Sequence, residues 1–361
     1  MKSGKTLVEL ATEITRRAEA KKDYIVPTKN IVMSGGVDST LLHFGDHAAE
    51  PNNYAHGQLA VYTGIPKPYY DKMRDDMPAL LAHNVNHWMR KAGETRMIRT
   101  LDGGMRAFLS DRYRPMENEE LAEAVLPVLS DLGVEIMSSE ITDRRMYIKA
   151  VDQKVMRSIP KGKAFGDGSH TIFTTDELCP AIVISNSEVG AGMLSVQTSL
   201  FTRACTNLAI FNERSIRKHH VGGRHELTDG LYHMLSDETR RVTDRALWLQ
   251  VKDVVRGAFD AARFNALVDK VHGMTEQKIE GDVVKVVDLA GRRLGITEDD
   301  RKSVLRHLIE GGDLSRYGLF NAVTRTAEDI ADYDKATEFE SLGGAVVDLS
   351  PTEWRELARA A

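Results

Sequence analysis

The stretch NIVMSGGVDSTLL, residues 30–42, decides between two folds for the N-terminal part of the chain. A Ser-Gly-Gly-x-Asp-Ser run suits a loop that holds a pyrophosphate, because glycines let backbone N–H groups approach the oxygens without a Cβ in the way. Such a loop lies between a buried parallel strand and the N-terminus of a helix, whose dipole favours the anion. The same residues also suit the tight turn of an antiparallel hairpin.

The residues after this run favour the hairpin. STLLHFGD reaches a glycine too soon for a full helix, and no apolar strand follows until about residue 97. A doubly wound sheet would instead continue strand, helix, strand. We therefore expect Ile31 and Met33 on one strand and Leu42 and Phe44 on the next. An ATP-pyrophosphatase-type enzyme that uses the SGGVDS loop is the alternative hypothesis.

Further along the chain, strand-like runs alternate with helical ones. TRMIRTLDGGMRAFLSDRY predicts a hairpin around Asp-Gly-Gly, and VEIMSSEITDRRMYIKAVD predicts another that turns near Thr142 and Asp143. From about residue 226 the apolar spacing is helical almost to the end. The sequence therefore predicts an α+β fold, with an antiparallel, hairpin-rich core and packed helices over residues 1–225. A helical C-terminal region over residues 226–361 follows it.

Composition excludes several classes of protein. The net charge of -5 argues against a uniformly basic nucleic-acid binder but not against a local basic surface. Two cysteines, Cys179 and Cys205, lie far apart, so neither a disulfide framework nor a zinc ribbon is indicated. No run approaches the roughly 18–20 apolar residues of a membrane span. We expect an unexported protein in a reducing compartment, with no membrane partner.

Positive charge is concentrated in the middle of the chain. Residues 141–225 hold twelve Lys and Arg against seven Asp and Glu, a net charge of +5 in a chain whose total is -5. A basic segment in an acidic chain is what a local phosphate-binding surface leaves in a sequence. Two solvated charged faces are the alternative interpretation.

Two clusters within this segment combine cations with aromatic or histidine side chains. RRMYIKAVDQKVMRSIPKGKAFGDGSH mixes cations with Tyr147 and Phe165, a combination that serves backbone charge and base stacking of a single strand. ERSIRKHHVGGRH adds more cations and three histidines. The predicted DNA-binding residues are Arg144, Arg145, Tyr147, Lys149, Lys154, Arg157, Lys161, Lys163, Phe165, Arg214, Arg217, Lys218, His219, His220 and Arg224.

Other polar groups have simpler explanations than catalysis. HHxxxxH, from His219 to His225, lacks the paired CxxC or HExxH frame of a metal site. In ISNSEVGAG we expect the hydroxyls and Glu188 to satisfy backbone amides, with Gly190 and Gly192 at positive φ. We therefore predict no catalytic residue, no cofactor and no metal.

Six longer stretches carry a family resemblance. They are HGQLAVYTGIPKPYYDKM, RAFLSDRYRPMENEEL, ITDRRMYIKAVD, IVISNSEVGAGMLSV, FTRACTNLAIF and YGLFNAVTRTAED, spread over residues 25–345. In this order they resemble a phage- and plasmid-borne family known as domain of unknown function nine-three-two. The resemblance implies a role in DNA metabolism but supplies no set of catalytic residues. A looser similarity is to phage single-strand annealing proteins, which have a β-hairpin-rich core and assemble into rings or filaments.

Together these features lead to a functional expectation. We expect a protein of a phage or other mobile element that binds single-stranded DNA and promotes annealing and recombination in the cytoplasm of a bacterial host. The resemblance implies a homo-oligomer, either a ring or a filament. A structural or host-interaction protein is a further alternative.

Overall fold

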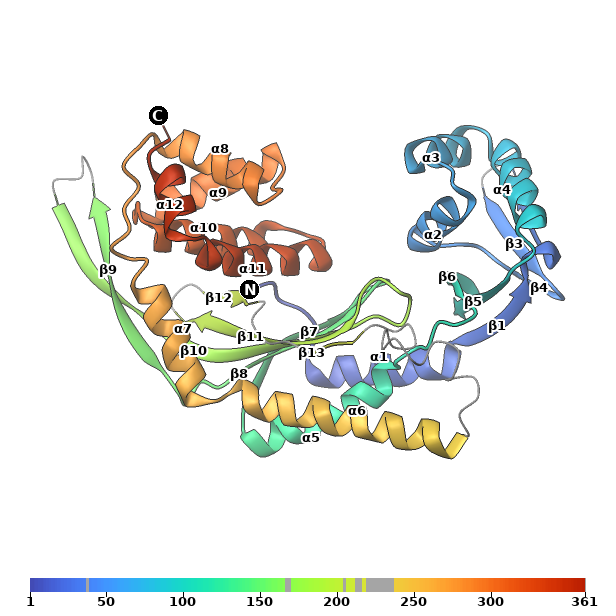
Figure 1. Cartoon of the computed structure of the whole chain (residues 1–361), viewed down its shortest axis with the longest axis horizontal. Coiled ribbons are helices and arrows are strands. Elements are labelled where there is room, and N and C mark those ends of the chain that lie inside the picture. Colours follow the sequence, from blue (N-terminus) through green and yellow to red (C-terminus); the bar gives the residue numbers. More distant parts are fainter. Residues whose placement is uncertain (37–38, 166–169, 204–205, 212–215, 219–236, 361) are drawn as a thin grey trace.

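The computed structural model describes residues 1–36, 39–165, 170–203, 206–211, 216–218 and 237–360. In these residues the strands form three antiparallel sheets, helices pack against them, and the C-terminal part is helical (Figure 1). The predicted α+β class is confirmed. The predicted boundary between residues 225 and 226 lies outside the described residues.

The deciding stretch forms an antiparallel hairpin, as predicted. β2 (Ile31–Gly35) pairs with β3 (Thr40–Phe44), and Ile31 lies opposite Phe44. Alternate residues of the two strands are buried, as expected for a hairpin with one covered face. β2 leads into another strand and not into a helix, so the strand–turn–helix frame of a pyrophosphate loop is missing between residues 31 and 44. Asp38 itself lies outside the described residues.

Gly35 has a packing role in this hairpin. A Cβ at this position would lie 2.4 Å from the carbonyl carbon of Pro78, which begins α4 (Pro78–Ala92). Any side chain would push the helix off the strand. Glycine is therefore required here by the close approach of α4, which explains its presence without a bound phosphate.

The elements from residue 22 to residue 110 lie around this hairpin at the right of Figure 1, whereas the first helix lies below the central sheet. β4 (His47–Ala49) extends its sheet, and a second sheet has the order β1-β5-β6. The predicted Asp-Gly-Gly hairpin joins β5 to β6, with Asp102 at φ 52 and Gly103 at φ 81. The other bounds are α1 (Leu7–Ala20), β1 (Lys22–Pro27), a 3-10 turn (Thr28–Asn30), α2 (Asn53–Thr63), α3 (Lys67–Asp76), β5 (Thr95–Leu101) and β6 (Gly104–Ser110).

The central sheet has the order β12-β11-β10-β8-β7, with β9 and β13 joined to its path. β7 and β8 form the second predicted hairpin, and β10 is 17 residues long and continues into a two-stranded ribbon with β9. The bounds are β7 (Glu135–Ile141), β8 (Met146–Val151), β9 (Arg157–Phe165), β10 (His170–Asn186), β11 (Leu194–Thr202), β12 (Asn207–Ile210) and β13 (Ile216–Lys218).

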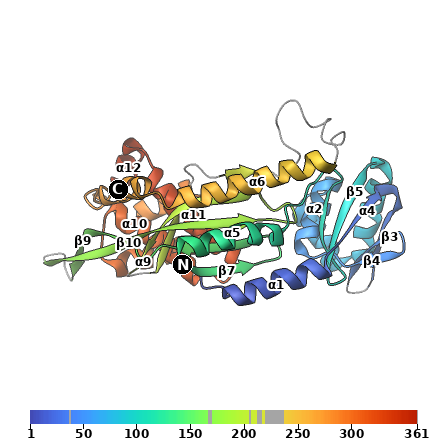
Figure 2. The ribbon, with the colours of Figure 1, turned by 90° about the horizontal axis from the view of Figure 1, so that it is seen from below.

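Helices cover both faces of this sheet. α1, α5 (Asn118–Leu132) and α6 (Asp237–Ala258) lie side by side on one face (Figure 2), where their apolar stripes pack against Ile148, Ile182 and Ile184. Tyr333 of α11 (Tyr333–Asp348) packs on the other face against Tyr147 and Val183. Residues that alternate along one strand therefore enter different cores.

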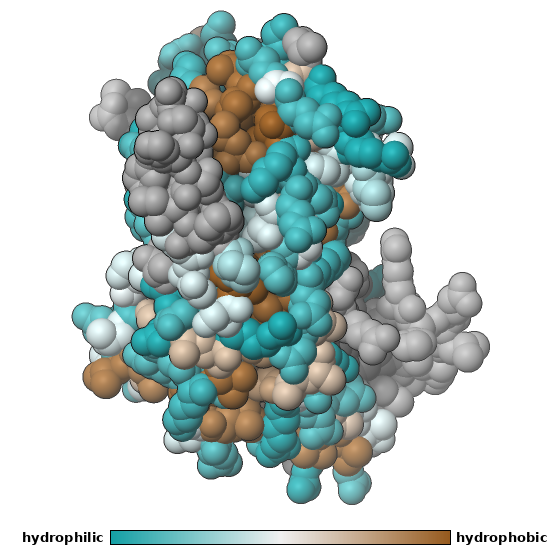
Figure 3. Space-filling model, turned by 90° about the vertical axis from the view of Figure 1, so that its left-hand side faces the viewer, coloured by the Kyte–Doolittle hydropathy of each residue, from teal (hydrophilic) through white to brown (hydrophobic). Residues whose placement is uncertain are grey.

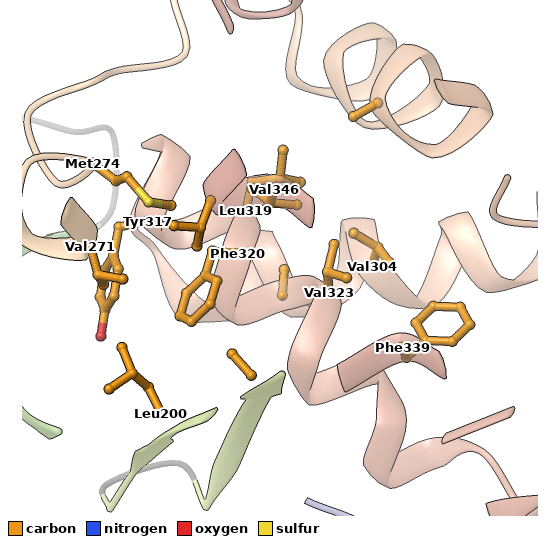
Figure 4. Packing of buried hydrophobic residues seen from close by; sticks show 14 of the residues in the cluster. Leu200, Val271, Met274, Val304, Tyr317, Leu319, Phe320, Val323, Phe339 and Val346 are labelled. Carbon is orange, nitrogen blue, oxygen red and sulfur yellow. The ribbon is translucent and has the colours of Figure 1, made fainter. Parts of the chain in front are cut away.

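The C-terminal helices form a further core around α10 (Figure 4). Tyr317 and Phe320 of α10 pack with Leu200 of β11 and with Val271 and Met274. Arg316 at the start of α10 donates to the carbonyls at the end of α11, including that of Val346 at 2.9 Å. The bounds are α7 (Ala261–His272), α8 (Val283–Arg293), α9 (Glu298–Gly311), α10 (Arg316–Asp329) and α12 (Pro351–Ala358).

A buried charge cluster joins the N-terminal part to the central sheet. Arg99 of β5 is fully buried and donates to Asp23 (2.8 Å), Glu117 (2.7 Å) and the carbonyl of Glu188 (2.7 Å). The carboxylate of Glu188 accepts from Arg106 (2.8 Å) and from the backbone N–H at the start of α5. Glu188 thus satisfies a backbone amide, as the sequence predicted.

Candidate functional site

Three hollows adjoin one another around α2 and the β7–β8 turn. Asn52 begins α2 by accepting a hydrogen bond from the N–H of Ala55, and Gly64 ends it at φ 68. Tyr54, Gln58 and Tyr62 follow at four-residue spacing and so lie on one face of this helix. We call the region that these hollows form the α2 groove.

One hollow of the groove, which we call the aromatic pocket, has a volume of about 750 Å³. Its walls include three aromatic and three cationic side chains, and among the residues that the structure describes no Asp or Glu lines it. The guanidinium of Arg96 lies over the Tyr62 ring, 4.3 Å from its centroid. These six side chains are Tyr54, Tyr62, Phe108, Lys67, Arg96 and Arg144.

Hydrogen bonds fix the walls of the aromatic pocket. Gln58 accepts from the N–H of Phe108 (2.7 Å) and donates to the carbonyl of Val189 (2.8 Å), which ties α2 to β6 and to the β10–β11 loop. In that loop the hydroxyl of Ser187 accepts from the N–H of Ala191 at 2.9 Å. Gly190 has φ 79, as predicted. The pocket is therefore held by three separate parts of the fold.

The predicted positive φ at Gly192 is wrong, and glycine is needed there for another reason. Its φ is not in the left-handed region, but a Cβ there would lie 1.8 Å from the guanidinium of Arg145. Arg145 donates to the carbonyl of Ala191 at 2.6 Å. Glycine at position 192 therefore provides space for Arg145 and not a special backbone angle.

Three of the predicted DNA-binding residues, Arg144, Arg145 and the buried Tyr147, line the α2 groove. The side chain of Arg144 is 49% exposed, and its Nε is 3.6 Å from a carboxylate oxygen of Asp334 in α11. Both arginines act on Tyr54: burial raises the pKa of its hydroxyl, and their positive charges oppose that rise. The β7–β8 turn thus brings two cations beside an aromatic side chain of α2.

Two of the predicted residues, Lys149 and Tyr147, are buried and already have partners within the fold. Lys149 is 0% exposed and pairs with Glu340 of α11 at 2.7 Å. Tyr147 is 4% exposed and donates to Asp334 at 2.8 Å. Both are buried because α11 covers this face of β8. Lys149 is held by its ion pair, whereas Tyr147 still lines the smallest hollow of the groove.

The other described cations of the basic segment lie elsewhere. Lys154 is exposed in the loop after β8, beside Gly133 at the end of α5. Arg157 pairs with Asp269 of α7 at 2.8 Å. Figure 3 faces the end of the molecule with the β9–β10 ribbon, where hydrophilic residues surround smaller hydrophobic patches. The described cations do not gather on one surface, so the expectation of a single basic face is not supported.

The remaining predicted residues cannot be placed as side chains. The backbone of β9 carries Lys161, Lys163 and Phe165, and that of β13 carries Arg217 and Lys218. Their side chains lie outside the described part of the structure. The residues that lie wholly outside the described ranges are Arg214, His219, His220 and Arg224.

Five of the six aromatic and cationic side chains of the aromatic pocket were not predicted from the sequence: Tyr54, Tyr62, Phe108, Lys67 and Arg96. The four-residue spacing of Tyr54, Gln58 and Tyr62 was a usable signal, since it places them on one helix face. No comparable pattern marks Arg96, which comes from β5. Its partner ring lies more than thirty residues away in the chain.

A second hollow of the groove contains a buried histidine. His56 is 4% exposed; its Nδ1 lies 2.9 Å from the Tyr70 hydroxyl and its Nε2 lies 3.4 Å from that of Thr40. Burial, together with the positive charges of Arg74 and Lys67, lowers the pKa of His56 to about 4. The imidazole is therefore neutral near neutral pH.

We expect this histidine to make the stability of the protein depend on pH. The unfolded chain takes up a proton near pH 6.5 and the folded chain only near pH 4, so stability falls as the pH is lowered through this window. The loss is up to about 3 kcal/mol at about 1.4 kcal/mol per pH unit. Urea unfolding at several pH values measures it, and His56→Gln should flatten the curve. An unchanged curve in the variant would contradict the assignment.

Neither a metal site nor a membrane segment is found in the described residues. No group of three or more His, Cys, Asp or Glu is placed to hold a metal there. Cys179 is buried in the central sheet, whereas Cys205 and His225 lie outside the described ranges. None of the described helices is long and apolar enough to cross a bilayer.

Comparisons with protein-family models, with curated proteins and with solved structures find no match for this chain. The family resemblance seen in the sequence therefore stays a prediction.

Proposed function

We propose that this chain binds single-stranded nucleic acid in the α2 groove and promotes the annealing of complementary strands. The observation that carries the proposal is the aromatic pocket, which combines three aromatic and three cationic side chains without a lining carboxylate in the described residues. Its volume of about 750 Å³ lies within the range of about 300–1,000 Å³ that is usual for ligand pockets. The family resemblance points in the same direction.

The chemistry of the pocket suits an unpaired base with its phosphate. A base stacked on an aromatic side chain contributes about 1–3 kcal/mol and needs no particular sequence. The cations Lys67, Arg96 and Arg144 face the same space and suit the negative backbone. A base in a duplex is already paired and stacked, so the pocket favours single strands over double strands.

The site is local, and this limits how salt-sensitive binding should be. Three cations at the pocket correspond to a slope of about -2 in a plot of log K against log salt, at about -0.7 for each phosphate contact of a single strand. A broad basic face with ten or more contacts would give a far steeper slope. Titrations at several salt concentrations separate these two cases.

The matched substitutions Arg144→Glu and Lys154→Glu test where the strand binds. Both residues are exposed and belong to the basic segment, but only Arg144 lies in the groove. We expect Arg144→Glu to weaken binding of a short labelled oligonucleotide about tenfold or more, since a charge-assisted hydrogen bond contributes about 1.5–3 kcal/mol. Lys154→Glu should change the affinity less than about threefold. Fluorescence anisotropy measures both, and equal losses would disprove the groove.

Annealing and assembly form the second part of the proposal. We expect the protein to speed the pairing of two complementary labelled strands and to self-associate, as the resembled annealing proteins do. Pyrophosphate release from ATP that disappears in Asp38→Ala would instead support the enzyme hypothesis. Neither DNA binding nor ATP cleavage would support a structural or host-interaction protein.

A further inference from the structure

A smaller hollow of the α2 groove adjoins the aromatic pocket. It has a volume of about 210 Å³ and lies between α11 and the strands β8, β10 and β11. Tyr54 and Arg144 line both hollows, so a strand bound in one would continue directly into the other. At about 30 Å³ per water molecule, the space equals about seven waters, enough for one base. We call it the acceptor pocket.

The walls of the acceptor pocket differ in chemistry from those of the aromatic pocket. Besides Arg144, Arg145, Gln197 and two tyrosines, they carry the hydroxyls of Ser185, Thr337 and Ser341 and the carboxylates of Asp334 and Glu338. A carboxylate can only accept hydrogen bonds. The carboxylate side of this pocket therefore suits a ligand edge that donates, whereas the aromatic pocket, which no described carboxylate lines, suits an apolar face beside a phosphate.

The two carboxylates are in different situations. Asp334 is already engaged: it accepts from Tyr147 at 2.8 Å and from Thr142 at 3.2 Å, and it lies 3.6 Å from Arg144. Glu338 is exposed, and the described part of the structure gives it no hydrogen bond or ion pair. Glu338 is therefore the carboxylate available to a ligand.

We propose that the acceptor pocket receives the base next to the one in the aromatic pocket, and that Glu338 selects a base with an exocyclic amino group. This inference rests on the proposed function. Arg144 lies between the two pockets and holds the phosphate that links the two nucleotides. Cytosine presents an N4 amino donor to Glu338, whereas thymine presents the O4 acceptor at the same place.

The selectivity follows from the acceptor-only carboxylate. Cytosine donates one charge-assisted hydrogen bond to Glu338, while thymine places its O4 acceptor against the carboxylate, where the two acceptors repel and no hydrogen bond forms. We expect oligo(dC) to bind about tenfold more tightly than oligo(dT) of the same length. Both are pyrimidine strands of equal charge, so the difference reports on the base edge.

Two matched substitutions test this assignment by fluorescence anisotropy. Glu338→Gln supplies a donor as well as an acceptor, so the dC-to-dT affinity ratio should fall to about two or less. Glu356→Gln removes the same charge on α12, away from the groove, and should leave the ratio unchanged. Removing a negative charge strengthens binding of both oligonucleotides alike, and the ratio cancels that effect.

The outcomes distinguish this inference from the function on which it rests. If neither oligonucleotide binds, the proposed function fails and this inference with it. If both bind equally to the unmodified protein, selectivity by Glu338 is refuted while nucleic-acid binding stands. If Glu338→Gln keeps the ratio of the unmodified protein, another group makes the selection and the role of Glu338 is overturned.

Discussion

Replacing Glu340 with leucine should lower the free energy of unfolding by about 3–5 kcal/mol, because it leaves a buried charge without its partner. The side chains of Glu340 and Lys149 are both 0% exposed, and the Nζ of Lys149 lies 2.7 Å from the Oε2 of Glu340. The ammonium of Lys149 also lies over the Tyr333 ring, 4.4 Å from its centroid. Water cannot replace the lost carboxylate at this depth. Denaturant unfolding at neutral pH measures the loss.

Two controls identify the buried charge as the cause. The double variant Lys149→Met with Glu340→Leu removes both charges and should regain most of the lost stability. Glu338→Gln, on the exposed side of the same helix, should stay within about 0.5 kcal/mol of the unmodified protein. Equal losses in the single and double variants would show that packing, and not charge, holds α11 on the sheet.

The pH dependence of Glu340→Leu gives an independent check. Burial lowers the pKa of Lys149, and in the unmodified protein Glu340 opposes that shift. Without Glu340, the Lys149 side chain binds its proton more weakly in the folded state than in the unfolded state. The free energy of unfolding therefore falls as the pH is lowered below the pKa that Lys149 has in the unfolded chain. The single variant should therefore be less stable than the double variant, and this difference in unfolding free energy should be larger near pH 6 than near pH 9.

The second large effect is expected at Arg99. Arg99→Met should cost about 3–5 kcal/mol, since this fully buried guanidinium holds Asp23, Glu117 and the carbonyl of Glu188 together. These partners come from β1, from the start of α5 and from the β10–β11 loop. Their loss should loosen the joint between the N-terminal sheets and the central sheet. Thermal and denaturant unfolding both report it.

Arg16 offers a matched control for Arg99. It also bonds two acidic residues, Glu13 and Asp102, but its side chain is 45% exposed. Arg16→Met should cost no more than about 1 kcal/mol, because exposed ion pairs contribute little. Similar losses at positions 16 and 99 would mean that burial does not set the energy of the cluster.

Local patterns were enough to predict the hairpins and the helical C-terminal region. The β2–β3 register follows from the alternation of Ile31, Met33, Leu42 and Phe44, because one face of the hairpin must be buried. The β5–β6 turn follows from Asp-Gly-Gly, whose first two residues adopt positive φ. Such features depend on neighbours in the chain and so are visible in the sequence.

The site was harder to predict, because it depends on contacts between distant segments. Lys149 counted as one cation among twelve, but α11 covers it, and its partner Glu340 lies 191 residues further along the chain. A net charge of a segment does not say which faces of its strands are covered. Arg144, Arg145 and Tyr147 of the predicted set line the groove beside Tyr54, and no local pattern distinguishes the two arginines from the other cations.

The long strand β10 contributes side chains to two different cores, and this affects how the protein unfolds. Ile182 and Ile184 belong to the core beneath α5 and α6, while Cys179, Ala181 and Val183 belong to the core beneath α11. If the helices on one face of the sheet separate from it, they expose β10 residues that alternate with the residues buried on the other face. The middle of the protein should therefore melt cooperatively, as a single foldon, and amide protons along this strand should be among the last to exchange.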